Sequence, residues 1–196
     1  MLPSCHNPVF LVHGIFDTGR RMRHIARYLQ RTGREVHSVT LTPANGSALL
    51  EILARQLRDF IEANTGKDQK IDLIGFSMGG LICRYYLQRL DGVSRTDHFI
   101  SISTPHEGTI MAGVLPSQGV KQMRRGSDFL RQLNTDCEIL QQVKLTSIWT
   151  PYDLIIVPAK SACFKQGNLI KVPALLHHLV VKNRSCLRAI EEALEK

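Results

Sequence analysis

A serine between two glycines is the clearest sign of chemistry in this sequence. Residues 75–79, GFSMG, match Gly-x-Ser-x-Gly, the pattern of a nucleophilic serine on a sharp turn from a strand into a helix. An apolar run at 71–76 precedes Ser77 and a helix-like stretch follows it, as such a turn requires. A side chain at either glycine would collide with the neighbouring strand or helix. The pattern alone also fits a buried strand with a glycine-rich exit, so the partner residues must decide between the two interpretations.

A serine hydroxyl needs a histidine base that a carboxylate holds in place. When the nucleophile follows a strand in this way, the chain order is serine, acid, histidine, with the later two at the carboxyl ends of later strands. Asp153 fits the acid, because it follows the predicted strand 144–150 directly. Asp136 and Glu138 precede that strand, and Asp128 lies in a helical pattern.

The base is expected in the sequence PALLHHLVV, which contains His177 and His178. Both follow the predicted strand 167–172 and precede a closing helix whose N-cap is Asn183, so spacing does not separate them. The other histidines lack this placement. His13 and His106 end strands and could shape the cleft, whereas His6, His24, His37 and His98 are predicted to be surface residues.

An oxyanion hole needs two backbone N–H groups. Met78 follows the nucleophile directly and is expected to supply one of them. Ile15 is expected to supply the other, from the turn after the first strand, where Gly14 lets the backbone approach closely. His13 is then interpreted as a structural residue that braces this turn.

Strand-like apolar runs alternate with helix-like segments along the chain, which predicts an α/β fold. The expected architecture is one domain over residues 1–196, with about six strands in a mostly parallel sheet and helices on both faces. Ligands bind beyond the carboxyl ends of such strands. Residues 105–136 contain no predicted strand and are expected to border the cleft. The predicted strands are 7–14, 35–41, 70–76, 97–104, 144–150 and 167–172.

Composition is that of a globular protein, with 43% hydrophobic and 21% charged residues among 196. No apolar run approaches the ~20 residues of a membrane-spanning helix, and the first residues lack the pattern of a signal peptide, so a cytoplasmic location is expected. The five cysteines are scattered without a Cys-x-x-Cys pair, which argues against a disulfide framework and a zinc site. No metal or other cofactor is expected.

The net charge of +8 could favour anionic partners. The densest basic stretch is 20–34, where Met22, Ile25, Ala26 and Leu29 have helical spacing. Its arginines are interpreted mainly as the solvated face of an amphipathic helix, with contact to an anionic membrane surface as the alternative. No nucleic-acid-binding pattern accompanies the charge.

Several motifs together resemble the α/β-hydrolase superfamily, in particular small lidless lipases and esterases, over nearly the whole chain. The motifs are VHGIFD, LIGFSMGG, ISISTPHEGT, GSDFLRQLN, WTPYDLIIVP and the C-terminal histidine stretch. The resemblance implies Ser77 as nucleophile, Asp153 as acid, and Ile15 and Met78 as oxyanion donors. Lipases of this kind tend to carry two apolar residues three and four positions after the histidine, which selects His177, with His178 as the alternative.

Two departures from the hydrolase pattern accompany the resemblance. The sheet begins at the strand that leads into His13 and Gly14, so the first two strands of the larger fold are missing. Residues 105–136 are the only segment in the position of a lid.

The resemblance implies a serine hydrolase that cleaves carboxylic acyl esters through an acyl-enzyme, with an ester or lipid as substrate. An acyltransferase with the same triad is the nearest alternative. The others are a hydrolase-fold protein that binds lipid or regulates without turnover, and an ordinary doubly wound domain with accidental motifs. Oligomeric state does not follow from the sequence.

Overall fold

The computed structural model describes residues 6–196, so Cys5 lies outside the described part of the chain. One sheet holds six parallel strands in the order β2-β1-β3-β4-β5-β6. This confirms the expected fold class. The strands are β1 (Val9–Val12), β2 (Val36–Val39), β3 (Ile71–Phe76), β4 (Thr96–Ile102), β5 (Lys144–Trp149) and β6 (Asn168–Lys171).

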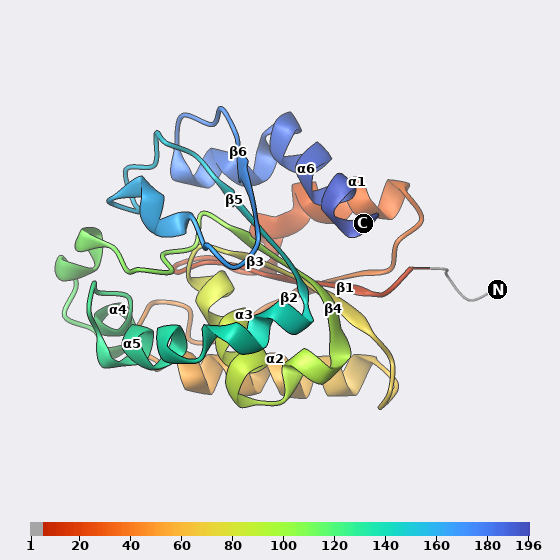
Figure 1. The fold of residues 1–196 in the computed structure, drawn as a ribbon, viewed down its shortest axis with the longest axis horizontal. Helices are drawn as coiled ribbons and strands as arrows, with labels where there is room; N and C mark the ends of the chain where they lie inside the picture. Colours follow the sequence, from red (N-terminus) through yellow and green to blue (C-terminus); the bar gives the residue numbers. More distant parts are fainter. Residues whose placement is uncertain (1–5) are drawn as a thin grey trace.

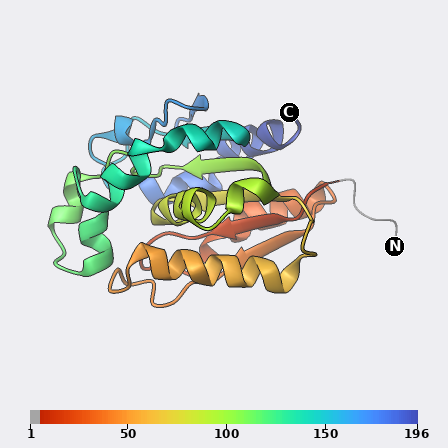
Figure 2. The same cartoon turned by 60° about the horizontal axis from the view of Figure 1, so that its bottom comes forward.

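Helices cover both faces of the sheet (Figures 1 and 2). One face carries α1 (Arg23–Arg31) and α6 (Arg184–Leu194), and the other carries α2 (Leu50–Asn64) and α3 (Met78–Arg89). Each layer has its own apolar core, because alternate residues of a strand point to opposite faces of the sheet. Phe10 and Val12 of β1 pack toward α2 and α3, whereas Val9 and Leu11 pack toward α1 and α6.

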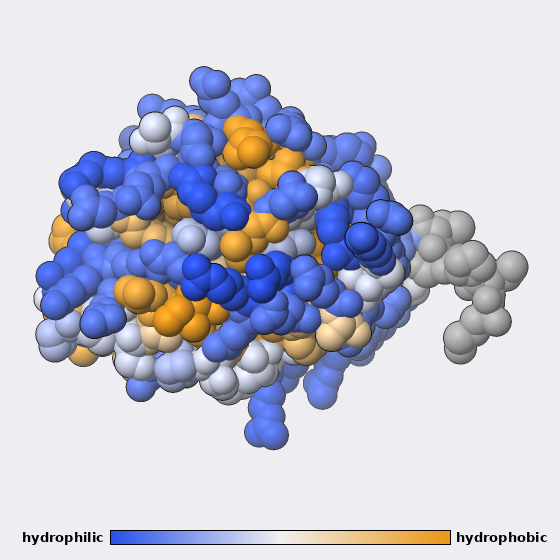
Figure 3. Space-filling view, turned by 90° about the horizontal axis from the view of Figure 1, so that it is seen from below, coloured by the Kyte–Doolittle hydropathy of each residue, from blue (hydrophilic) through white to orange (hydrophobic). Residues whose placement is uncertain are grey.

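Short elements complete the chain between these layers. Among the described residues they are α4 (Gln118–Gln122), α5 (Asp128–Thr135) and six short 3-10 helices: η1 (Gly19–Met22), η2 (Gly92–Arg95), η3 (Ile110–Gly113), η4 (Cys137–Gln142), η5 (Ala159–Ala162) and η6 (His177–Lys182). Within residues 6–196 there is no helix with the length and apolar character needed to cross a membrane. The face seen from below is largely hydrophilic, with apolar side chains in separate patches (Figure 3).

Local patterns in the sequence predicted most of these elements. The Asn183 side chain caps α6, since its oxygen accepts from the backbone N–H groups of Ser185 and Cys186. The apolar residues of the basic stretch 20–34 are buried as predicted. Arg34 is buried too, near Asp72, and donates to the Leu194 carbonyl, so it does not belong to the solvated face.

Two expectations were wrong in detail. The sequence predicts a helix from about Ser47 to Asn64 whose apolar stripe is Leu49, Ile52, Leu53, Leu57 and Phe60. In the structure α2 begins at Leu50 and buries Leu50, Leu53, Ala54, Leu57 and Ile61, so its apolar face is rotated from that stripe, and Ile52 is exposed. His98 was expected at the surface but is buried. It lies opposite Asp72 on the neighbouring strand β3, and the two side chains are joined through His98 Nδ1 and Asp72 Oδ1 at 2.8 Å.

The segment 105–136 lies against the loop that follows β5. The Ile110 N–H donates to the Val157 carbonyl at 2.9 Å, and the Thr109 hydroxyl donates to the Ile155 carbonyl at 2.7 Å. His106 N–H donates to the Ser161 carbonyl at 2.9 Å. These bonds fix the segment beside the loop that contains Asp153.

Candidate active site

Ser77 stands where β3 ends and α3 begins, in a backbone conformation that few non-glycine residues adopt. Its φ of 54° and ψ of −123° place it in a strained region, as expected for a nucleophile on such a turn. Its own N–H donates to the Ile102 carbonyl at the end of β4, and its carbonyl accepts from Gly80 N–H. The turn is therefore tied both to the next strand and to the helix that it opens.

The glycines around Ser77 are required by close backbone contacts. A Cβ at Gly75 would lie 2.5 Å from the Gly80 Cα, and a Cβ at Gly79 would lie 2.4 Å from the Val12 carbonyl oxygen. Both distances are far below van der Waals contact, and the obstacles are backbone atoms. A Cβ at Gly14 would lie 3.1 Å from the Ser77 Cβ, so the loop after β1 passes directly against the serine. The steric role predicted for the two glycines of Gly-x-Ser-x-Gly is confirmed.

His177 and Asp153 meet in a buried pair at the same end of the sheet. His177 Nδ1 lies 2.7 Å from Asp153 Oδ2, and the other carboxylate oxygen accepts from the N–H groups of Ile155 and Ile156. Burial works to raise the pKa of Asp153, but the hydrogen bond and charge of His177, together with the two N–H groups, hold that pKa below its usual value. An ionised Asp153 holds the proton on Nδ1, which leaves Nε2 as the basic nitrogen.

The histidine ring lies beside the serine turn. The rings of His177 and Phe76, the residue before Ser77, are 4.8 Å apart between centroids and tilted by 32°. His178 is exposed, although sequence spacing could not separate it from His177. The competing acids are exposed as well: Asp136 pairs with Arg89, Asp128 with Arg131, and Glu138 lies on η4.

The loop after β1 is held by His13. Its Nδ1 donates to the Gly14 carbonyl at 2.8 Å, and its Nε2 accepts from Leu41 N–H at 3.0 Å. Burial lowers the pKa of His13, against the raising effects of the Gly14 carbonyl and Asp17, which keeps it neutral in this role. Phe16, with φ of 59°, donates its N–H to the Ala44 carbonyl. The expected oxyanion donor Ile15 lies between Gly14 and Phe16, whose backbones these hydrogen bonds hold in place.

The other expected donor, Met78, is the first residue of α3, and its side chain is fully buried. The first N–H groups of a helix have no acceptor within the helix and carry the positive end of its dipole. Met78 therefore has only its backbone N–H to offer at the site. Within residues 6–196, no cluster of three His, Cys, Asp or Glu side chains is placed to hold a metal ion.

Sequence reasoning missed a buried polar network beneath the cleft-bordering segment. His106 Nε2 lies 3.0 Å from the Ser101 hydroxyl, which lies 2.9 Å from the Ser147 hydroxyl. Arg84, which is fully buried, lies 3.5 Å from His106 Nδ1 and 4.4 Å from the centre of the Phe164 ring. A charged residue at position 84, within the apolar stretch 81–87, was the available signal.

Comparison with known proteins decides the family. The family model described as palmitoyl protein thioesterase matches residues 8–135, well over half of the chain. The chain belongs to the palmitoyl protein thioesterase family. The matched segment contains the loop after β1, the Ser77 turn and most of the cleft-bordering segment. Asp153 and His177 lie beyond it, and their assignment rests on the geometry.

Curated thioesterases match about half of the chain. Lysosomal thioesterase PPT2 from Homo sapiens is 35% identical over 109 residues, which are 54% of this chain and 36% of the human protein. The Mus musculus protein of the same name is 35% identical over 114 residues, 54% of this chain and 37% of its own length. The chain thus covers little more than a third of the relatives that it matches.

Solved lipases share the fold over almost the whole chain. Aspergillus fumigatus lipase B superimposes with a TM-score of 0.81 at 16% identity, over 97% of this chain and 53% of that one. Bacillus licheniformis lipase BlEst2 in its mature form gives 0.80 at 14% identity, over 97% and 93%. At such identities the likeness shows the fold alone. This palmitoyl protein thioesterase family member is therefore built on the α/β-hydrolase fold.

Proposed function

We propose that this protein hydrolyses fatty acyl thioesters and esters through Ser77, His177 and Asp153. The observation that carries the proposal is the hydrogen-bonded pair of His177 and Asp153 at 2.7 Å, beside a serine turn with φ of 54°. Each of the three residues follows the carboxyl end of a strand of one sheet, in the chain order that serine hydrolases of this fold use. Membership of a thioesterase family supports thioesters as a substrate class.

Each step of the proposed reaction has a residue that carries it out. The Ser77 hydroxyl attacks the acyl carbonyl carbon while His177 Nε2 takes its proton, and the carbonyl oxygen becomes an oxyanion. The N–H groups of Ile15 and Met78 stabilise that oxyanion. The intermediate expels the thiolate or alkoxide, which takes the proton from His177, and leaves an acyl group on Ser77. Water then attacks the acyl-enzyme with His177 as base, releasing the fatty acid and restoring Ser77.

The carboxylate of Asp153 stabilises the imidazolium that forms twice in this cycle. The need for proton donation by His177 differs with the leaving group. A thiol has a pKa of about 8.5, so a thiolate leaves without full protonation, whereas an alkoxide needs the proton of His177. The same residues can thus act on both bond types, with the greater demand on His177 for esters.

A paired substrate series tests the proposal. Acyl thioesters and p-nitrophenyl esters of equal chain length are offered to the unmutated protein and to Ser77→Ala, and both are treated with a fluorophosphonate probe. We expect turnover of both classes and labelling of the unmutated protein only. Ser94→Ala, on η2 at the far end of the sheet, is the matched control. It should retain turnover of both substrate classes and labelling by the probe.

The alternatives give different results in the same assay. Acyl transfer would appear as acylated alcohol formed in place of free fatty acid when an alcohol is added. A protein that binds without turnover would give neither product nor label. Labelling that persists in Ser77→Ala would rule out Ser77 as the nucleophile.

A further inference from the structure

Exposed apolar side chains concentrate around the candidate active site. Within residues 6–196, eleven of the fourteen large hydrophobic side chains with high exposure lie in the loops that follow β1, β4, β5 and β6. We call these the apolar rim, and define it as the exposed apolar residues at 16, 110–115, 152–155 and 175–179. Single exposed apolar residues are ordinary on protein surfaces, but a concentration of this kind marks an interaction site.

Three rim residues directly adjoin residues of the proposed site in the chain. Phe16 follows Ile15 in the loop after β1, Leu154 follows Asp153, and Leu176 precedes His177. Six rim residues are more than half exposed: Phe16, Ile110, Val114, Tyr152, Leu154 and Leu175. The rim therefore includes the loops that carry Ile15, Asp153 and His177.

The rim loops are held by hydrogen bonds to one another. Thr109 joins residues 155 and 157, because its hydroxyl donates to the Ile155 carbonyl and accepts from Val157 N–H. The Arg124 guanidinium donates to the carbonyls of Ala112 and Leu115. These hydrogen bonds hold the rim segments 109–115 and 155–157 in place.

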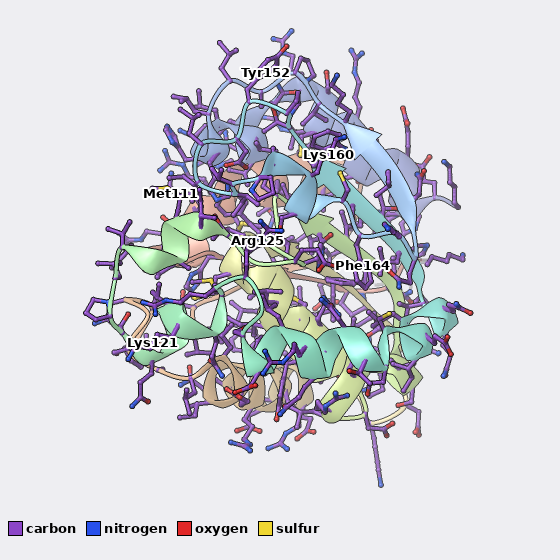
Figure 4. The ribbon with its side chains drawn as sticks, turned by 60° about the vertical axis from the view of Figure 1, so that its left-hand side comes forward. Met111, Lys121, Arg125, Tyr152, Lys160 and Phe164 are labelled. Atoms are coloured by element: carbon purple, nitrogen blue, oxygen red, sulfur yellow. The ribbon has the colours of Figure 1, made fainter. Side chains whose placement is uncertain are left out.

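Unpaired cations flank the rim on two sides. Arg20, Arg23 and Lys182 share a pocket of about 260 Å³ with Phe16, and its one acid, Asp17, is paired with Arg21 at 2.7 Å. We call them, together with Lys121, Arg125 and Lys160, the basic flanks. All six are exposed, and none forms an ion pair among the described residues. Figure 4 shows Lys121, Arg125 and Lys160 on the same side of the molecule as Met111 and Tyr152.

We propose that the apolar rim and basic flanks dock this protein onto the anionic lipid surface of a membrane, with Ser77 facing the bilayer. Apolar side chains inserted at the headgroup boundary together with cations near anionic headgroups are the two attractions that hold a protein at such a surface. The net charge of +8 has the complementary sign. The inference extends the proposed function, since acyl chains anchored in a membrane would meet the serine directly.

Vesicle sedimentation tests the docking apart from catalysis. Ser77→Ala protein is mixed with vesicles of phosphatidylcholine alone or with added phosphatidylserine. We expect tight binding to the anionic vesicles, weaker binding to the neutral ones, and weakening by salt. Adding Val114→Asp and Leu175→Asp should raise the Kd at least tenfold, and Arg125→Glu with Lys160→Glu should remove the preference for anionic vesicles.

Matched variants on other surfaces serve as controls. Ile52→Asp with Ile139→Asp changes exposed apolar residues outside the rim, and Arg27→Glu with Arg31→Glu changes exposed cations farther along α1. Both pairs should bind vesicles like the parent. Equal losses in rim and control variants, or no sedimentation with anionic vesicles, would overturn the proposal.

The docking and the proposed function fail in distinguishable ways. With Ser77 present, Val114→Asp and Leu175→Asp should turn over a water-soluble short-chain thioester at the rate of the unmutated protein. If Ser77→Ala protein binds anionic vesicles but unmutated protein hydrolyses nothing, the docking stands and the catalytic proposal falls. If the unmutated protein hydrolyses its substrates but does not bind vesicles, the catalytic proposal stands and the docking falls.

Discussion

The imidazole Nδ1 of His177 and the carboxylate Oδ2 of Asp153 lie 2.7 Å apart, although 24 residues separate them in the chain. Asp153 follows β5 and His177 begins η6 after β6, so neighbouring parallel strands deliver the two side chains to one edge of the sheet. The Ile155 and Ile156 N–H groups hold the second carboxylate oxygen. The carboxylate is thereby fixed from both sides.

Asp153→Asn is expected to reduce kcat by about 10⁴, the loss known for the equivalent change in a serine protease triad. The amide removes the charge that stabilises the imidazolium and no longer selects the Nδ1–H tautomer of His177. The fold should survive, because the amide oxygen can still accept from Ile155 and Ile156. Thioester and ester assays measure the loss, and Asp128→Asn on exposed α5 is the control. Near-full activity in Asp153→Asn would contradict the assignment.

Gly79→Ala is expected to destabilise the protein by several kcal/mol and to abolish activity, since the new Cβ meets the carbonyl oxygens of Val12 and His13 at 2.4 and 2.5 Å. Those backbone atoms belong to β1 and the loop after it, and they cannot rotate away. Gly113→Ala, with nothing within 4 Å of its Cβ, should unfold at the same denaturant concentration as the unmutated protein. Urea unfolding compares the two variants, and equal midpoints would contradict the steric argument.

Local signals in the sequence predicted the parts of the site that depend on neighbours in the chain. The Ser77 turn is an apolar run, two glycines and a helix start, and Asn183 caps the helix after the histidine stretch. The strands were found within a few residues of their ends, because buried parallel strands are continuous apolar runs.

Contacts between distant residues could not be predicted in the same way. His98 was misplaced because its burial depends on Asp72, which the β3–β4 register sets opposite it. Which side of α2 is buried depends on how the helix packs against the sheet. Several apolar residues of α2 are compatible with either orientation of the helix, so the sequence alone did not select one. The choice of His177 over His178 came from resemblance, and only the fold shows that one is buried against Phe76 while the other is exposed.

His106→Gln is expected to make the protein less sensitive to acid. Burial, with a further contribution from the charge of Arg84, holds the pKa of His106 well below its usual 6.5. Below pH 6.5 the unfolded chain therefore binds a proton that the folded protein refuses, and stability falls by up to about 1.4 kcal/mol per pH unit from this residue. Gln can retain a hydrogen bond to Ser101 without titrating. Urea unfolding between pH 7.5 and 5.5 should show a shallower fall for His106→Gln, and parallel falls would contradict the prediction.

Arg84→Met is expected to change the free energy of unfolding by no more than about 1 kcal/mol, although Arg84 is fully buried. Burial lowers the pKa of its guanidinium to about 10, and no carboxylate pairs with it among residues 6–196. Arg84 Nη2 donates to the Leu133 carbonyl on α5 at 2.8 Å, and that carbonyl keeps a donor after the change because Gln88 Nε2 also lies 2.8 Å from it. Methionine removes a desolvated charge while filling most of the volume, whereas Arg84→Ala leaves a cavity and should cost about 3 kcal/mol. Urea unfolding of both variants measures the difference. A loss of stability in Arg84→Met as large as in Arg84→Ala would contradict the prediction. It would mean that the hydrogen bonds of Arg84 to α5 and its contact with the Phe164 ring outweigh the cost of burying its charge.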